Sequence, residues 1–197
     1  MIKKQLRPAV LLTFVFIVVT GLVYPGIVTA VARVAFPNQS SGSLVAVNGR
    51  IIGSRLIGQQ FSQPWYFHPR PSAAGKGYDA TASGGTNKGP TDRKLADTLI
   101  AGAITDAESR GVPRGKVPSD MATASASGLD PHISPANAMF QVPRVAAARG
   151  VDTSLVGALV RRHIAGRQFG FLGDPRVNVL ELNLALDSIA PRQAGAQ

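Results

Sequence analysis

The sequence predicts a single N-terminal transmembrane helix followed by one extracytoplasmic α/β (α+β) domain with long loops. Two observations carry this prediction. Residues 9–32 contain no charged side chain, whereas the flanking residues are basic. Beyond residue 43, short apolar runs alternate with segments rich in Gly, Pro and Ser, a pattern typical of a domain that mixes short strands, helices and loops.

Residues 9–32 are long enough to cross a bilayer. As an α-helix, these 24 residues rise about 36 Å, and the hydrocarbon core of a bilayer is about 30 Å thick. Ala30-Val31-Ala32 also fits the small-residue pattern of a signal-peptide cleavage site. A signal peptide has an apolar region of about 7–15 residues, shorter than this run, so an uncleaved anchor is expected.

The flanking charges predict the orientation of this helix. Lys3, Lys4 and Arg7 precede it, whereas Arg33 alone follows it closely. Positive charge is enriched on the cytoplasmic side, so residues 1–8 are expected in the cytoplasm. The chain is therefore predicted to be a single-pass protein of the cell inner membrane, with its C-terminal domain periplasmic or otherwise extracytoplasmic.

Small residues interrupt the apolar run. Pro25 lacks a backbone donor, so Tyr24-Pro25-Gly26 is expected to bend or loosen the helix. Gly21 and Gly26 lie among bulky Leu, Val and Phe residues, and small residues let helices approach closely in lipid. They are predicted to contact a partner helix, with the alternative that they merely accompany the bend.

Residues 33–43 are expected to be a linker, 44–189 the domain and 190–197 a flexible tail. Asn48-Gly49 between two β-prone runs predicts a type I′ hairpin with strands 44–47 and 50–53. Capping and breaking residues predict three helices. The first covers 92–110, is capped by Thr91 and is ended by Gly111 and Pro113. The second begins at Pro135, is capped by Ser134, is broken or kinked at Pro143 and is ended by Gly150, and the third is capped by Asp152. After the turn Gly173-Asp174-Pro175, residues 177–186 alternate well enough to predict a strand.

Two long loops, 58–90 and 111–133, are expected to carry the function, because binding residues concentrate on loops held by a scaffold. The first contains Trp65, Tyr66 and Phe67, with Arg70 close by. Aromatic residues and Arg are enriched at interface hot spots, which predicts a partner contact here. The alternative is that these rings pack inside their own domain and clamp the loop.

The sequence offers weak candidates for catalysis. Ser125, Ser127, Asp130 and His132 lie close together in the second loop, as an anchored extracytoplasmic serine hydrolase would need. No G-x-S-x-G motif is present, and a turn with a hydrogen-bonded histidine accounts for the same residues. The three histidines are widely spaced and there is no cysteine, so no metal site is predicted. The formal net charge of +10 would allow binding to nucleic acid, but a domain outside the cytoplasm does not encounter genomic DNA, so no nucleic-acid partner is expected.

A glycine-rich turn, Ser83-Gly84-Gly85-Thr86-Asn87, precedes the helix expected from residue 92. Backbone amides in such a turn can bind an anion. The turn does not match the G-x-x-x-x-G-K-[ST] phosphate loop, so a tight structural turn is the simpler interpretation.

The chain resembles, over nearly its full length, the C subunit (KdpC) of the Kdp-type potassium-transporting ATPases. The resemblance is carried by ordered motifs: Val23-Tyr24-Pro25, Gly53-Ser54, Leu56-Ile57-Gly58-Gln59, Phe61, Tyr66-Phe67-His68, Arg70-Pro71-Ser72-Ala73, Ser83-Gly84-Gly85-Thr86-Asn87, Val117-Pro118, Thr123-Ala124-Ser125-Ala126-Ser127-Gly128-Leu129-Asp130, Pro143-Arg144-Val145-Ala146 and Leu180-Glu181-Leu182-Asn183-Leu184-Ala185-Leu186-Asp187. Thr86 stands where the family pattern has Ser, and it keeps the hydroxyl.

The resemblance implies an accessory subunit with no catalytic site of its own. Its partners would be the membrane-embedded ATP-hydrolysing and potassium-channel-like subunits of a P-type ATPase complex, together with the lipid bilayer. It would assist assembly and raise the ATP affinity of the hydrolysing subunit, while K⁺ is the transported ion of the complex and is not bound here. The family's label as ATP-binding points to Ser83–Asn87. Because the domain is expected outside the cytoplasm, ATP contact is expected on the partner subunit instead, with coupling across the membrane.

Overall fold

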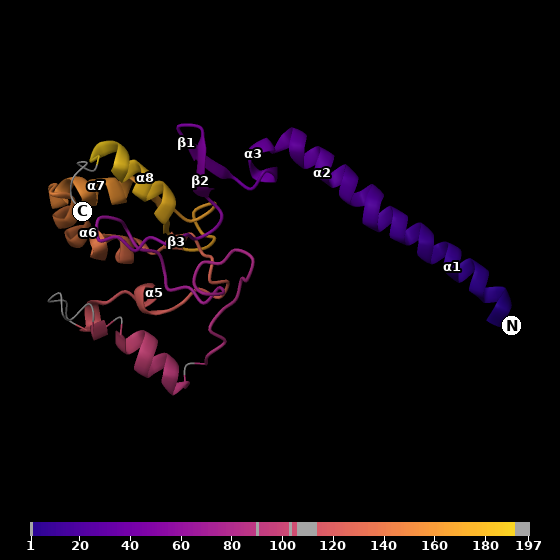
Figure 1. The fold of residues 1–197 in the computed structure, drawn as a ribbon, viewed down its shortest axis with the longest axis horizontal. Coiled ribbons are helices and arrows are strands. Elements are labelled where there is room, and N and C mark those ends of the chain that lie inside the picture. The colour runs from indigo at the N-terminus through magenta and orange to yellow at the C-terminus, as the bar shows by residue number, and fades with distance from the viewer. Residues whose placement is uncertain (1, 90, 103, 106–113, 192–197) are drawn as a thin grey trace. The chain divides into compact units, whose positions relative to one another are not determined.

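The computed structural model describes residues 2–89, 91–102, 104–105 and 114–191 and divides into two compact units, residues 1–52 and 53–197 (Figure 1). The first unit consists of a long helix and most of a hairpin. The second is a domain of mixed helices and short strands. The predicted succession of one apolar helix and a mixed helix–sheet domain is therefore observed.

The N-terminal helix is longer than the apolar run that predicted it. Its segments are α1 (Ile2–Val18), the π-helical turn η1 (Val19–Val23) and α2 (Tyr24–Ala35). Residues 4–35 form one candidate span with a mean hydropathy of 2.3, and none of its apolar window is buried within the protein. By length and composition, this helix is a candidate membrane span.

The π-helical turn lies directly before Pro25. Here the Tyr24 N–H donates to the carbonyl of Val19, five residues back. Proline cannot donate to the carbonyl four residues before it, and its ring crowds that carbonyl. A wider turn relieves this crowding. The expected loosening of the helix before Pro25 thus takes the form of a π-turn.

After the short helix α3 (Pro37–Ser40), β1 (Leu44–Val47) and β2 (Arg50–Ser54) pair as a two-stranded sheet. Asn48 and Gly49 both have positive φ, 52° and 77°, as a type I′ turn requires. The predicted hairpin is confirmed, although the linker before it contains a helical turn.

The second unit is built around a small antiparallel sheet of order β3-β5-β4. Its described elements are η2 (Leu95–Ile100), η3 (Arg114–Lys116), α5 (Ser119–Ala122), β3 (His132–Ile133), α6 (Pro135–Arg149), α7 (Thr153–Arg162), β4 (Ile164–Ala165), β5 (Arg176–Asn178) and α8 (Val179–Ile189). The core joins α6, α7, α8 and the sheet, and it consists of Phe67, Ile133, Ala138, Val142, Val145, Ala146, Val156, Leu159, Val160, Val177, Val179, Leu182 and Leu186.

The prediction of a strand over 177–186 is wrong. The strand β5 ends at Asn178, and the helix α8 begins at Val179. Asn178 caps this helix by accepting a hydrogen bond from the Glu181 N–H. An Asn three residues before a Glu is a helix-start signal, and it outweighs the short apolar alternation that followed. Leu182 and Leu186 are then buried at helical spacing.

Most other helix predictions hold. Ser134 accepts from the Asn137 N–H, and Gly150 ends α6 in a left-handed conformation. Asp152 caps α7 by accepting from the Ser154 N–H. The helix continues past Pro143, so of the two predicted alternatives the break does not occur, and the kink stays a prediction.

The first predicted helix differs at its start. Its cap is Asp92, which accepts from the Leu95 N–H, and not Thr91. Helical backbone covers 93–102 and 104–105, including a π-helical stretch. The predicted C-terminal end at 106–110, with Gly111 and Pro113, lies outside the described residues. In the predicted tail, Ala190 is buried against the domain, whereas 192–197 lie outside the described residues.

Candidate functional site: loops held on a helical scaffold

Residues 123–130, the central loop, accept hydrogen bonds at their backbone carbonyls from segments far away in the sequence. The Gly58 N–H donates to the Leu129 carbonyl at 2.7 Å. The Ser72 hydroxyl donates to the Gly128 carbonyl at 2.6 Å. The two long loops predicted from the sequence therefore form one joined structure.

The glycine-rich turn also contacts the central loop. The Gly84 N–H and the Ser83 hydroxyl both donate to the Ser127 carbonyl, at 2.9 and 3.0 Å. A side chain at Gly85 would lie 2.7 Å from the Ala126 carbonyl oxygen. Two of the donors that an anion-binding turn would offer are thus already used within the domain.

Arg70 holds the ends of the central loop together. Its guanidinium donates to the Ala124 carbonyl at 3.2 Å and lies 3.4 Å from an Asp130 carboxylate oxygen. The Arg70 carbonyl in turn accepts from the hydroxyl of Tyr78, and burial raises the pKa of Tyr78 to about 12, so this hydroxyl stays a donor. Arg70 therefore stabilises the central loop inside the domain.

Two buried amides hold the backbone of the aromatic segment. Asn183 accepts from the Phe67 N–H at 2.8 Å and donates to the Phe67 carbonyl at 3.0 Å. Gln141 does the same for His68, at 2.7 and 2.9 Å. Both amides are nearly inaccessible to solvent. Each satisfies a donor and an acceptor that would be costly to leave unpaired.

Arg149 extends this arrangement. Its guanidinium donates to the carbonyls of Trp65 and Ala190, at 2.9 and 2.8 Å, and pairs with Asp187 at 2.8 Å. It also lies 5.1 Å from the centroid of the Tyr66 ring, within range of a cation–π interaction. The Tyr66 hydroxyl donates to the same Asp187 carboxylate.

These contacts correct one expectation about the partner interface. Phe67 is fully buried in the core, so its ring is not available to a partner, because it supplies packing between the helices. Trp65, Tyr66 and Arg70 are half-buried. A partner contact by these three stays a prediction, and the alternative of clamping inside the domain is observed for Tyr66 and Phe67.

The hydrolase candidates are not arranged as a triad. Asp130 accepts from the His132 N–H at 3.0 Å and lies 3.4 Å from its Nδ1, which forms a turn of the kind expected. The Ser127 hydroxyl oxygen accepts from the Leu129 N–H instead, and the structure records no hydrogen bond between Ser127 and His132 among the described contacts. Ser125 is buried.

Protonation of Asp130 should weaken the central loop. Burial acts to raise the pKa of Asp130, but hydrogen bonds and charge from His132, with Arg70 adding to them, outweigh it, so the pKa lies below its ordinary value of 3.8. The stabilisation is present above that ordinary value and is lost as pH falls through the lowered pKa. In urea unfolding between pH 5 and about pH 3, Asp130→Asn should lose less stability than the unmodified chain. Parallel pH profiles would contradict this role.

A polar hollow of about 320 Å³ opens beside this turn. Its lining combines both signs of charge: Arg70, Asp120, Asp130, His132, Ile133, Ser134, Asp174, Pro175 and Arg176. The Asp120 carboxylate lies at the start of α6, where it accepts hydrogen bonds from the N–H and hydroxyl of Ser134 and from the side-chain amide of Asn137. Among the described residues, no group of three or more His, Asp or Glu side chains is placed to hold a metal ion.

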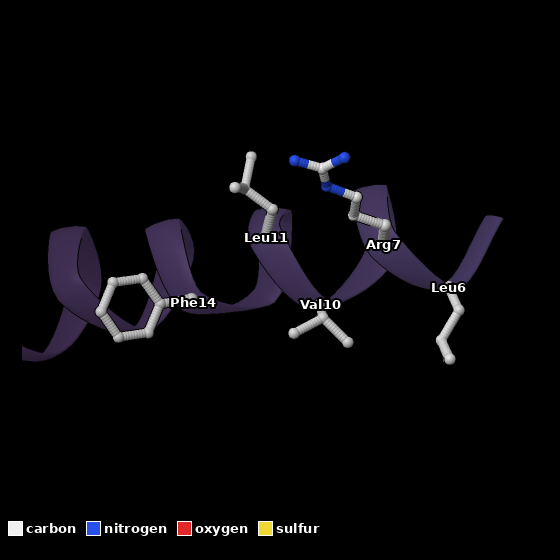
Figure 2. Close-up of a pocket in the computed structure, with 5 residues that line it drawn as sticks. All are labelled: Leu6, Arg7, Val10, Leu11 and Phe14. Carbon is white, nitrogen blue, oxygen red and sulfur yellow. The ribbon is translucent and has the colours of Figure 1, made fainter. Parts of the chain in front are cut away.

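In the first unit, an open hollow of about 510 Å³ lies along the N-terminal helix, lined by Leu6, Arg7, Val10, Leu11 and Phe14. Figure 2 shows Arg7 and Leu11 projecting to one side of this helix and Leu6 and Val10 to the other. Gly21 and Gly26 have no atom of the rest of the protein near the position of a side chain. Within the described residues, both glycine positions are therefore open, and their predicted contact with a partner helix stays a prediction.

Comparison with known proteins decides the family. The model of the family described as "KdpC: K+-transporting ATPase, c chain" matches residues 6–188. The chain belongs to the KdpC family.

Similar relatives are described as potassium-transporting ATPase KdpC subunits. The protein from Koribacter versatilis is 55% identical over 190 residues, covering 96% of this chain and 97% of the relative. Those from Gemmatimonas aurantiaca and Caulobacter vibrioides are each 54% identical, covering 95% of this chain and 94% and 95% of the relatives. The resemblance stated from the motifs is therefore confirmed.

The KdpC motifs, distant in sequence, meet in the second unit. The segments around Gly58, Arg70 and Ser83 all contact the central loop. Sequence reasoning missed Asn183, Gln141 and Arg149 as the residues that hold the aromatic segment. A signal was present for Asn183, an amide within the apolar run 180–186, but assigning that run to a strand concealed it.

Proposed function

We propose that this chain is a non-catalytic accessory subunit of an ATP-driven, high-affinity potassium import complex. The match of residues 6–188 to the KdpC family carries the proposal. The relatives are named as subunits of a potassium-transporting ATPase, so the partners are the ATP-hydrolysing and potassium-channel-like subunits of that complex. The ion passes through a partner and is not held by this chain.

The chain is anchored by its N-terminal helix with residues 1–8 in the cytoplasm and the folded domain outside it. The exposed apolar helix 4–35 and the excess of basic residues before it support this orientation. A reporter that is active only outside the cytoplasm, fused after Gln197, is expected to be active. Activity of a cytoplasm-only reporter at that position would reverse the topology.

The subunit raises the ATP affinity of the hydrolysing subunit without holding the nucleotide itself. The Ser83 hydroxyl and the Gly84 N–H both donate to the Ser127 carbonyl, which supports a structural role for the turn Ser83–Asn87. The effect then reaches the nucleotide as a coupling free energy between subunits. Removing this chain from the complex should raise the KM for ATP; an unchanged KM would exclude the coupling.

The open face at Gly21 and Gly26 is proposed as the contact with a partner helix. Replacing both with Leu should lower recovery of the complex in mild detergent, because bulk at these positions keeps the helices apart. The matched control replaces Val19 and Val28 with Leu, which changes side chains of the same span that are already bulky. Equal recovery of the two double variants would refute the contact while leaving the family assignment intact.

A further inference from the structure

The loop between β4 and β5 closes on itself in a turn whose end is exposed. Gln168 and Leu172 exchange two backbone hydrogen bonds, both 2.9 Å, as in a short antiparallel bridge. Arg167 and Asp174 pair across the base of the loop at 3.1 Å. The four residues Phe169–Leu172, the aromatic tip, are therefore presented in a defined conformation.

The aromatic tip exposes large apolar side chains. Phe169 is 87% exposed and Phe171 70% exposed. Among the described residues of the second unit, seven large apolar residues are exposed, and three of them lie in the tip: Leu56, Met139, Leu155, Phe169, Phe171, Leu172 and Ile189. Single exposed apolar residues are ordinary on a protein surface, whereas a cluster marks a contact site.

Folding of the domain gives no reason for a phenylalanine at position 169. Its φ is +52°, a left-handed conformation that disfavours a bulky side chain. Glycine or asparagine would adopt it with less strain. The ring therefore combines backbone strain with exposure to water, and a contact outside the domain would compensate this cost.

The sequence on either side of the tip is rich in arginine. Residues 161–176 contain four arginines and one aspartate. Arg161, Arg162 and Arg167 are exposed, and Arg167 is paired with Asp174, which leaves Arg161 and Arg162 as the basic flank on this side of the tip in the sequence. Apolar side chains at an exposed tip with a basic flank match the interface of an anionic bilayer, where rings enter the acyl boundary and guanidinium groups meet phosphate.

We propose that the aromatic tip inserts into the headgroup region of the membrane leaflet that faces the domain. This inference rests on the proposed membrane anchoring and not on the potassium complex. Only 17 residues separate Ala35, where the candidate span ends, from Gly53, so the domain stays within roughly 60 Å of the bilayer. Such tethering makes a weak insertion effective. The tip then fixes which face of the domain meets the membrane.

The chain has no cysteine, so a single nitroxide label can be placed at any chosen position. The full chain, without partner subunits, is reconstituted in nanodiscs of equimolar phosphatidylcholine and phosphatidylglycerol. Labels are attached to Phe171→Cys in the tip, Leu155→Cys as an exposed position on α7, and Phe14→Cys in the span. Collision with lipid-soluble oxygen is compared with collision with a water-soluble nickel chelate.

The label at 171 should favour oxygen over nickel by at least about threefold relative to the label at 155. Equal ratios at 171 and 155 would overturn the inference, and so would protection from both reagents, which indicates a protein pocket. The label at 14 tests the anchor separately. If it is exposed to nickel, the proposed anchoring fails; if it is in lipid and 171 is not, only the tip proposal fails.

A second variant separates insertion from folding. Phe169→Asn relieves the strained φ, so the thermal midpoint of the full chain should stay the same or rise. The same variant should move the label at 171 towards the nickel reagent. A lowered midpoint would show that the ring serves the fold, and an unmoved label would show that it does not contribute to insertion; either result contradicts the proposal.

Discussion

Replacing Arg149 with Ala should cost about 4 kcal/mol of stability and lower the thermal midpoint of the domain by roughly 10 °C. The Arg149 side chain is 2% exposed and serves three acceptors, the carbonyls of Trp65 and Ala190 and the carboxylate of Asp187. Truncation removes the donor that these three acceptors share. Near-ultraviolet circular dichroism during heating follows the loss of aromatic packing around the Tyr66 ring.

Two companion variants make the Arg149 experiment specific. Arg149→Lys keeps the charge, but one ammonium lacks the planar fork that reaches several acceptors, so an intermediate loss is expected. Arg162→Ala removes an exposed arginine from the end of α7 and should cost less than about 1 kcal/mol. If Arg149→Ala is no more harmful than Arg162→Ala, the aromatic segment is held by other contacts.

Gly128→Ala should destabilise the domain by about 3 kcal/mol or more and lower recovery of the complex with it. Gly128 has φ +68°, which a side chain strains. An added Cβ would lie 2.6 Å from the Ala74 nitrogen and 2.7 Å from the Gly84 oxygen. Both are backbone atoms of the neighbouring loops, so the loops themselves would have to move apart.

Gly150→Ala is the matched control for this prediction. Gly150 has nearly the same φ, +65°, but open space where the side chain would be placed. It should therefore show the backbone cost alone, about 1–2 kcal/mol. Denaturant unfolding of both variants isolates the steric part as their difference. Equal losses would mean that the loops are not tightly packed at Gly128.

Local signals predicted much of the fold. Asn48-Gly49 produced the hairpin, and Ser134, Gly150 and Asp152 marked helix ends, because turns and caps depend on neighbouring residues. The failures concerned the cap at Thr91 and the segment 177–186, where a helix follows a short strand. At 179–189 a local signal was present, because Asn178 caps the helix, but the burial of Leu182 and Leu186 against the core is a long-range contact that the short apolar alternation does not report.

The candidate site was predictable in outline only. The motifs identified the two long loops, and the structure shows that they join each other around the central loop. Which side chain serves which purpose depends on long-range pairing: Phe67 meets Asn183 from 116 positions away. The aromatic tip was missed for another reason, because exposure and a positive φ at Phe169 are visible only once the loop is folded.

Asn183 and Gln141 recognise the main chain of residues 67 and 68, and a main chain is the same whichever side chain it carries. At residue 67 the core still demands a large ring, but the His68 side chain is only partly buried and touches the Gln63 carbonyl. The hydrogen bonds from Gln141 to the main chain therefore do not depend on which side chain residue 68 carries. Substitution of His68 should therefore change the side chain at this position while the hydrogen bonds between Gln141 and its main chain are preserved.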